Sequence, residues 1–346
     1  MPDQPAGAAS KERFIGRKHM RIHLATFAAT LVLASAFPAA VPAQAPVQSW
    51  PQRPIKMICP FPAGGGTDFI ARLAAKHLSD RLGQQVYVEN RGGANGALGL
   101  QTLMQSDPDG YTIASVSDGP TVANPALYEK LAYQPLRDFI PVAMMIRYPS
   151  MLIAHPAVGV RNVAELIALA KTKPGVLTYS SGGTGNFSHL GLELLALQTG
   201  IKLLHVPYRG VGPATMALIG GDVQLMYNNV ATALEHVRAG KAVPLAIGDP
   251  KRLPALPDIP AIAETVPGFE MSAWVGIFAP ARTPKEIVAR LSKEVAGFLK
   301  DPDVVKIFAE QQIVDFYKDP DDLTQYVKQE LEKWDRVIKT AGIKGE

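Results

Sequence analysis

Two glycine-rich segments hold the residues of this chain that are best suited to bind an anion. The first runs from Phe61 through Ala63 to Asp68 and contains three consecutive glycines, Gly64, Gly65 and Gly66. It follows an apolar strand-like run and precedes apolar residues at helical spacing. A strand, a glycine turn and a helix start leave backbone N–H groups unpaired, and the helix dipole favours negative charge beside them. We expect an anion-binding cradle, although the same residues also suit a tight turn that uses glycine only for its geometry.

Phosphate-binding motifs fit this loop poorly. A P-loop requires the pattern GxxxxGK[ST], and no lysine follows these glycines at the required position. The dinucleotide-binding pattern requires G-x-G-x-x-G, whereas Thr67 and Asp68 follow the third glycine directly. An acidic residue at the helix start is also hard to reconcile with a phosphate placed on it.

The second segment, residues 176–189, repeats the order of strand, glycine loop and helix start. Small polar residues and glycines lead to Ser188, which is predicted to be the N-cap of the next helix. Two such loops far apart in sequence are expected if two lobes each contribute one cradle to a shared cleft. A pair of cradles suits a ligand with two anionic ends.

The first residues resemble a secretory signal peptide. Basic residues between positions 11 and 21 precede an apolar run from Leu24 to Phe37, and small residues allow cleavage after Ala43 or Ala45. The run is short for a membrane span, and translation could begin at Met1 or at Met20. We therefore expect a signal peptide over residues 1–45 and a periplasmic mature chain.

Charge and composition exclude nucleic-acid binding. Five of the 35 Lys and Arg residues and two of the 31 Asp and Glu residues precede residue 46, so the remaining chain carries a formal charge of about +1. Nucleic-acid binding would need a concentrated basic face. A hydrophobic content of 47% with few aromatic residues indicates α/β packing. The single cysteine, Cys59, is expected to be a buried strand residue.

The C-terminal region is predicted to be helical. The sequence from Thr283 to Glu286 matches a capping box with proline at the first helical position. Apolar residues then lie on one face over residues 287–298, and again over residues 323–338. With no strand pattern nearby, we expect these helices to pack on the first lobe.

The motifs of common enzymes are missing from the sequence. It contains no G-x-S-x-G elbow and no H-E-x-x-H metal helix. Ser188 and His189 are adjacent on a predicted helix start, so their side chains diverge and cannot form a nucleophile–base pair. The 7 histidines show no spacing typical of zinc ligands. We expect no catalytic residues, no metal site and no cofactor.

Five short motifs in a fixed order resemble one known family. They are Pro62-Ala63-Gly64-Gly65-x-x-Asp68-x-x-Ala71-Arg72, Val88-Glu89-Asn90-Arg91-x-Gly93-Ala94, Asp109-Gly110-Tyr111-Thr112, Pro207-Tyr208-Arg209-Gly210 and Leu256-Pro257-Asp258-x-Pro260. Together they resemble the Bug-type (TctC-like) periplasmic solute receptors of tripartite tricarboxylate transporters, from about Trp50 to the C-terminus. The resemblance implies an α/β, two-lobed type II periplasmic-binding-protein fold that closes on its ligand. It also implies binding of a small organic anion, mostly a carboxylate, and delivery to integral membrane permease subunits.

The resemblance assigns ligand-binding roles to two sets of residues. The loop from Phe61 to Asp68, with its alanine and three glycines, would be the first cradle, and Asp68 would help to order bound water. In the second lobe and on the walls, the implied residues are Ser117 with the segment that follows it to Thr121, Ser181, Gly182, Gly183, Thr184, Asn186, His189, Tyr208, Arg209 and Asn228. The chain departs from the common family pattern at Arg209, where lysine is frequent, and at Asn228, where aspartate is frequent.

Several of these residues have a structural alternative. Asp68 could be an N-cap paired with Arg72, His189 could anchor its loop by hydrogen bonds, and Trp274 is expected in the core. The predicted lobes are residues 46–147 with 269–346, and residues 148–268. We expect a monomer. Two alternative functions remain. One is a sensor partner that presents its ligand to a receptor kinase, and the other, less favoured, is a periplasmic enzyme that acts on a carboxylate. The ligand, and the choice between uptake and sensing, stay open.

Overall fold

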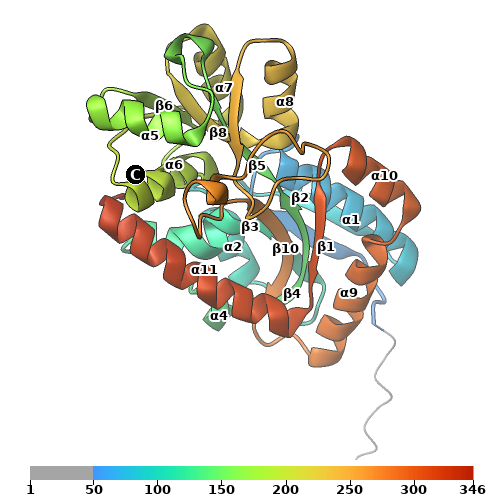
Figure 1. Cartoon of the computed structure of the whole chain (residues 1–346). Helices are drawn as coiled ribbons and strands as arrows, with labels where there is room; N and C mark the ends of the chain where they lie inside the picture. Colours follow the sequence, from blue (N-terminus) through green and yellow to red (C-terminus); the bar gives the residue numbers. More distant parts are fainter. Residues whose placement is uncertain (1–49, 346) are drawn as a thin grey trace, which may run out of the picture. The chain divides into compact units, whose positions relative to one another are not determined.

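Two β-sheets with helices on both faces build the part of the chain that this computed structural model describes, residues 50–345 (Figure 1). These residues belong to one compact unit, Ser49–Glu346. The predicted signal peptide and its cleavage sites lie outside the described residues. No helix within residues 50–345 is long and apolar enough to cross a membrane.

The first sheet has six strands in the order β11-β4-β10-β3-β1-β2. Its strands are β1 (Ile55–Cys59), β2 (Val86–Asn90), β3 (Thr112–Ser117), β4 (Phe139–Tyr148), β10 (Ala273–Pro280) and β11 (Val314–Lys318). Strand β1 runs parallel to β2 and β3, whereas β10 is antiparallel to both β3 and β4. Val275 pairs with Ser117, so the end of β3 and the start of β10 lie side by side.

Alternation of apolar residues along these strands explains why helices cover both faces. In β10, Val275 and Ile277 join one hydrophobic cluster, and Trp274 and Phe278 join another. The first cluster is completed by α1 (Gly66–Leu82), α9 (Lys285–Phe298) and α10 (Pro302–Glu310). The second is completed by α2 (Ala97–Met104), α3 (Asn124–Leu127) and α11 (Pro320–Ala341).

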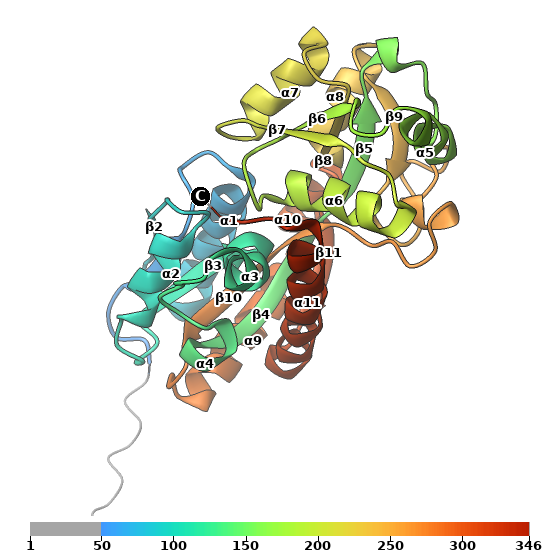
Figure 2. The same ribbon diagram turned by 90° about the vertical axis from the view of Figure 1, so that its left-hand side faces the viewer.

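The second sheet has five strands in the order β7-β6-β8-β5-β9. They are β5 (Ser150–Ala154), β6 (Thr178–Ser181), β7 (Leu204–Pro207), β8 (Leu225–Asn229) and β9 (Val243–Ile247). Helices α5 (Val163–Thr172) and α6 (Phe187–Thr199) pack on one face, and α7 (Val211–Gly220) and α8 (Val230–Arg238) pack on the other. Helix α11 contacts α6, so one hydrophobic cluster extends from the first sheet to the second (Figure 2). Four short elements complete the fold: a π-helix (Gly119–Ala123), α4 (Pro135–Asp138) and two 3-10 turns (Pro156–Val158 and Ile262–Glu264).

The chain passes between the sheets at two places. It leaves the first sheet after Tyr148 and joins the second at Ser150, and it returns between Ile247 and Ala273. The hydroxyl of Ser150 donates to the backbone oxygen of Met271, and Tyr227 Oη donates to the same oxygen over 2.8 Å. The predicted lobe boundaries, 147/148 and 268/269, lie close to these passages and stay a prediction.

A buried ion pair joins the same two passages. Arg147, near the end of β4, lies 2.9 Å from the carboxylate of Asp249, which follows β9. The Asp249 side chain is 3% exposed and the Arg147 side chain 16%. Burial raises the pKa of Asp249 to about 6, although the positive charge of Arg147 opposes this shift. The Arg147 guanidinium also lies over the ring of Phe316, 4.6 Å from its centroid.

The structure corrects the predicted start of the C-terminal helices and adds two elements that were not predicted. Helix α9 begins at Lys285 with Pro284 as its N-cap and no side-chain cap, so the predicted capping box is wrong. Thr283 is instead buried with no hydrogen-bond partner for its hydroxyl within residues 50–345. Helix α10 was missed, and so was β11, which pairs with β4 between two helices. These elements are short, and β11 alternates partly buried and exposed residues at the edge of the sheet.

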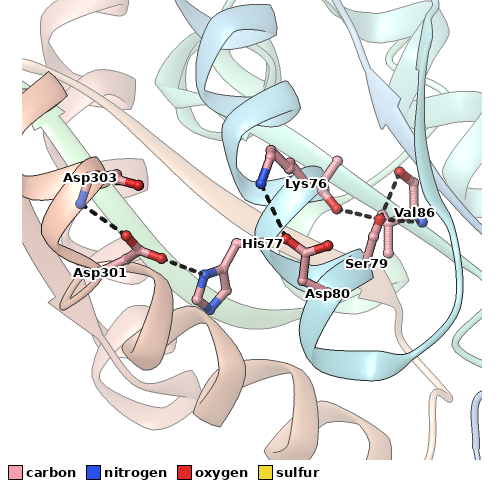
Figure 3. Close-up of polar contacts among 8 residues, drawn as sticks. Lys76, His77, Ser79, Asp80, Val86, Asp301 and Asp303 are labelled. Carbon is pink, nitrogen blue, oxygen red and sulfur yellow. Dashed lines mark hydrogen bonds and ion pairs between the residues drawn. The ribbon is translucent and has the colours of Figure 1, made fainter.

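Polar contacts tie α1 to the elements on either side of it (Figure 3). His77 lies 3.4 Å from the carboxylate of Asp301, which caps α10 by accepting the N–H of Asp303. On the same helix, Ser79 Oγ accepts the N–H of Val86 over 2.8 Å and so fixes the start of β2. Cys59 is a fully buried residue of β1, as predicted, and burial raises its pKa to about 11.

Candidate functional site

A cleft of about 810 Å³ lies where the loops of the two sheets meet. Its wall includes residues 61–67, which connect β1 to α1, and Gly182 to Thr184, which follow β6. The two glycine loops therefore face one cleft, as the sequence predicts. The start of β10 and the end of β3 complete the wall.

The first glycine loop presents unpaired backbone donors. Helix α1 begins at Gly66 with Gly65 as its N-cap, and the first helical bond runs from Phe69 N–H to Gly65 O. The N–H groups of Gly65, Gly66 and Thr67 have no hydrogen-bond partner within residues 50–345. Such groups at a helix N-terminus favour an anion. This loop can act as the predicted cradle.

Asp68 shapes this loop from behind the wall. The expectation that Asp68 is an N-cap is wrong, because it lies in the first turn of α1 and reaches back to accept the Gly64 N–H over 2.9 Å. The predicted pair with Arg72 is confirmed at 2.9 Å, and Asn90 Nδ2 donates to the other carboxylate oxygen over 2.8 Å. Burial acts to raise the pKa of Asp68, but Arg72, the Gly64 N–H and Asn90 together hold that pKa below its usual value. A charged Asp68 thus fixes the loop geometry.

The second glycine loop is different, because its own side chains occupy most of its backbone donors. The N–H of Gly182 donates to Ser188 Oγ, that of Gly183 to Ser181 Oγ, and that of Gly185 to His189 Nδ1, over 3.0, 3.1 and 3.0 Å. Glycine is required at 183 and 185 by φ values of 124° and 75°. The second loop is therefore a self-bonded turn, and it offers fewer free backbone donors than the first.

The donors that remain on the second loop lie at the start of α6. The N-cap is Asn186, whose Oδ1 accepts the Ser188 N–H over 3.0 Å, so the prediction of Ser188 as the N-cap is wrong. The backbone N–H groups of Thr184 and Phe187 have no partner within residues 50–345, and the same holds for Asn186 Nδ2. These groups can contact a ligand.

Two stacked histidines support the second loop from behind. The rings of His189 and His205 lie 3.8 Å apart and 6° from parallel. His205 Nε2 lies 2.6 Å from Ser181 Oγ, while His189 Nδ1 accepts the Gly185 N–H. Burial lowers the pKa of His189 to about 3 and that of His205 to about 4, so both rings are neutral at neutral pH. His189 anchors the loop, as one of its two sequence interpretations predicts.

The structure brings most of the predicted site residues onto the cleft wall. Those on the wall are Phe61, Ala63, Gly64, Gly65, Gly66, Thr67, Ser117, Gly182, Gly183, Thr184 and Asn186. Six others lie outside its lining: Asp68, Ser181, His189, Tyr208, Arg209 and Asn228. Arg209 is exposed, whereas Asn228 is fully buried and donates to Thr215 Oγ1 over 3.0 Å. A role in ligand binding stays a prediction for all of them.

Sequence reasoning missed several polar wall residues. Asn95, Tyr148 and Asn229 were not assigned to the site, and Trp274 was considered only as a core residue, whereas Asp118 lies in the implied wall segment 117–121. Asn229 stands at the carboxyl end of β8, where ligands commonly bind in α/β sheets, so this signal was available. Trp274 is fully buried as predicted and also contributes to the wall. Tyr148 Oη donates to Gly66 O over 2.9 Å, a long-range contact with no local sequence signal.

The electrostatics of the cleft depend on backbone dipoles and one acid. Among the described residues, no lysine, arginine or histidine lines the cleft, and Asp118 is the acidic side chain on its wall. Asp118 is 7% exposed, and burial raises its pKa to about 7. Within residues 50–345 no group of three His, Cys, Asp or Glu side chains is arranged to hold a metal ion. The arrangement can hold an anion by N–H groups without a basic side chain.

Comparison with known proteins places this cleft in a family context. Residues 70–343 match the sequence pattern of the tripartite tricarboxylate transporter family receptor, TctC. The chain belongs to this family. Protein BugT of Bordetella pertussis is similar to this chain, with 36% identity over 298 residues, which cover 86% of this chain and 91% of BugT.

Solved structures agree with the two-lobed fold. A Rhodopseudomonas palustris protein solved with adipate shares 35% identity and a TM-score of 0.77, covering 85% of this chain and 99% of its own. MatC from the same organism, solved with bound malate, shares 32% identity and a TM-score of 0.72 over 83% of this chain and 99% of its own. The periplasmic binding protein BugD has 34% identity and a TM-score of 0.73, covering 86% of this chain and all of its own. This TctC-type chain is therefore a two-lobed solute receptor of the α/β class.

Proposed function

We propose that this protein is an extracytoplasmic receptor that binds a small organic carboxylate in the cleft between its lobes. It then delivers the ligand to the integral membrane permease subunits of a tripartite tricarboxylate transporter. The observation that carries the proposal is the set of unpaired N–H groups of Gly65, Gly66 and Thr67, which open onto the cleft at the start of α1. Helix N-termini of this kind bind carboxylates by hydrogen bonds and by the helix dipole.

Further support comes from the relatives and from the shape of the site. Two family members were solved with the dicarboxylates adipate and malate. The cleft volume of about 810 Å³ leaves room for a molecule of this size together with water. Donors from Thr184, Asn186 and Phe187 stand on the opposite loop, where the second carboxylate would lie.

The family also supports the remaining parts of the proposal. Its description names the receptor of a transporter, so permease subunits are the proposed partners and the binding step involves no chemical conversion. The basic and apolar leader predicted over residues 1–45 would direct the chain to the periplasm. The lobes would close over the ligand by bending at the two passages between the sheets.

Calorimetric titration with adipate and malate tests the proposal directly. The Gly65→Val variant should lose binding, because its side chain would stand among the cradle N–H groups. A Cβ at Gly65 has Pro62 O at 3.8 Å as its nearest neighbour and the backbone φ is −82°, so the fold should survive. Gly220→Val, at the exposed end of α7 and outside the cleft lining, is the matched control and should bind normally.

A thermal-shift screen extends the test to other carboxylates. A ligand at 100 times its dissociation constant adds roughly 2.7 kcal/mol to the free energy of unfolding, which such a screen resolves. Unchanged affinity in Gly65→Val would move the site elsewhere. The absence of binding by every dicarboxylate tested would refute the proposed ligand class.

A further inference from the structure

One stretch of the cleft wall combines an acid with an unpaired buried donor. Asp118 directly follows β3, and Trp274 is the second residue of β10. Because Ser117 pairs with Val275, Asp118 and Trp274 occupy adjoining positions at the same end of neighbouring strands. Both residues line the cleft.

The indole nitrogen is the only polar atom of the Trp274 side chain. The side chain is fully buried, and its Nε1–H has no hydrogen-bond partner within residues 50–345. The indole packs instead against two rings, with centroids 6.4 Å from Phe278 and 6.1 Å from Tyr326. A buried N–H without a partner is unfavourable, so a ligand acceptor at this point would be favoured.

Asp118 supplies the complementary acceptor. Burial raises its pKa, and the charge of Glu330 on α11 acts in the same direction. The backbone N–H groups of Asp118 and Gly119, and the charge of Lys333 on α11, lower it. Tyr326 of α11 also lies within electrostatic range. With a pKa of about 7 the group is about half ionised at neutral pH and poorly solvated, and a ligand group that donates a hydrogen bond to it would stabilise the ionised form.

A hydroxyl group has the chemistry to satisfy both residues. It accepts one hydrogen bond and donates another, whereas an ammonium group only donates and a methylene group does neither. We propose that the cleft selects a hydroxycarboxylate, whose hydroxyl donates to Asp118 and accepts from Trp274 Nε1. This inference rests on the proposed function, because the carboxylate itself would be held by the glycine loops.

The test compares matched ligands that differ only at one carbon. Two series are used, each in both enantiomers where the molecule is chiral: succinate, malate and aspartate, and adipate, 2-hydroxyadipate and 2-aminoadipate. Affinities are measured by calorimetric titration. In at least one series the hydroxy form should bind about tenfold or more tightly than the unsubstituted form, as expected for a hydrogen bond to a charged group.

Variants then assign this preference to the two residues. Asp118→Ala should reduce the hydroxy preference at least tenfold while leaving the unsubstituted acid bound as well as before or better, since a negative charge is removed. Asp118→Asn should keep part of the preference, because its amide oxygen can still accept. Trp274→Phe should reduce the preference as well. Asp222→Asn removes the same charge at an exposed position outside the cleft lining and should change nothing.

The outcomes separate this inference from the proposed function. Three results would overturn the inference alone. They are equal binding of all three forms, a preference for the amino form, and a hydroxy preference that survives both Asp118→Ala and Trp274→Phe. Failure of every acid to bind the unmodified protein would overturn the proposed function and the inference together. Melting temperatures of the variants show whether each is folded before its affinity is interpreted.

Discussion

Replacement of Arg147 by methionine should produce a loss of stability that grows with pH. Arg147 is the cation beside the buried carboxylate of Asp249, and the two groups lie 2.9 Å apart. Methionine keeps much of the apolar packing near Phe316 but removes the charge. A buried carboxylate left without its cation is strongly destabilised in its ionised form. Asp249 should then take up a proton in the native state.

The pKa of Asp249 sets the magnitude of this loss. With Arg147 present the pKa is about 6, so the carboxyl is ionised at pH 7 in the native protein. Protonating a group about one unit above its pKa costs about 1.4 kcal/mol. We therefore expect Arg147→Met to cost roughly 1–2 kcal/mol at pH 7 through this route and little near pH 5.

The sign of the pH dependence follows from the protons bound. Above pH 6 the native variant holds one proton that the original native protein has released, and both unfolded chains have released theirs. The stability of the variant relative to the original therefore falls as pH rises, by up to about 1.4 kcal/mol per pH unit. The fall ends where the carboxyl of the variant ionises.

Urea unfolding at pH 5, 7 and 8.5 measures this effect. The double variant Arg147→Met/Asp249→Asn has no carboxyl to protonate, so its stability difference should not depend on pH in this way. Arg209→Met removes an arginine that is exposed, and it serves as the control. A constant loss at all three pH values, or the same slope in the double variant, would refute the reasoning.

Three further predictions concern the loops and the core. Asp68→Ala should lower the free energy of unfolding by about 2 kcal/mol, since it removes the acceptor of the Gly64 N–H. The control Asp80→Ala removes only an exposed ion pair with Lys76 and should cost less than about 1 kcal/mol. Thermal unfolding compares the two variants, and equal effects would contradict the role of Asp68 in the loop. The pKa of His189 is lowered to about 3 in the folded state, so as pH drops below about 6.5 the unfolded chain binds the proton first and the protein becomes less stable. The free energy of unfolding in urea should therefore be about 2 kcal/mol lower at pH 5 than at pH 7 because of this ring alone. A His189→Gln variant should lose that part of the pH dependence. Cys59, fully buried with a pKa of about 11, should react with a thiol reagent only as fast as the protein opens, and rapid stoichiometric labelling of the native protein would show that the thiol is accessible.

The sequence predicted the parts of the site that depend on local chain geometry. Strand, glycine turn and helix start occur together over a few residues, so both loops and the fact that they share a cleft followed from pattern alone. The caps were predicted less well. Ser188 and Asp68 have the residue types of N-caps, but Asn186 and Gly65 take those positions, because several neighbouring residues could start the same helix.

The missed features depend on contacts between distant residues. No local signal shows that the second loop donates its N–H groups to its own Ser and His side chains, since this depends on how α6 packs. Trp274 and Asp118 are 156 positions apart and meet on the wall only because β10 returns to pair with β3. Strand β11 was missed for a similar reason, because a short edge strand with alternating polarity resembles a loop until its partner strand is known.

The unpaired peptide groups of the first loop have a consequence for how such a receptor diversifies. A contact made by Gly65, Gly66 and Thr67 through the backbone does not depend on the identity of a functional side chain, so most substitutions elsewhere on the wall leave it intact. Under the proposed function, the neighbouring side chains, Asp118 among them, can then be exchanged one at a time without abolishing recognition of the carboxylate. Selectivity can change in single mutational steps, each of which passes through a protein that still binds an acid. A receptor encoded by a duplicated gene can thus gain a new ligand without first losing the old one.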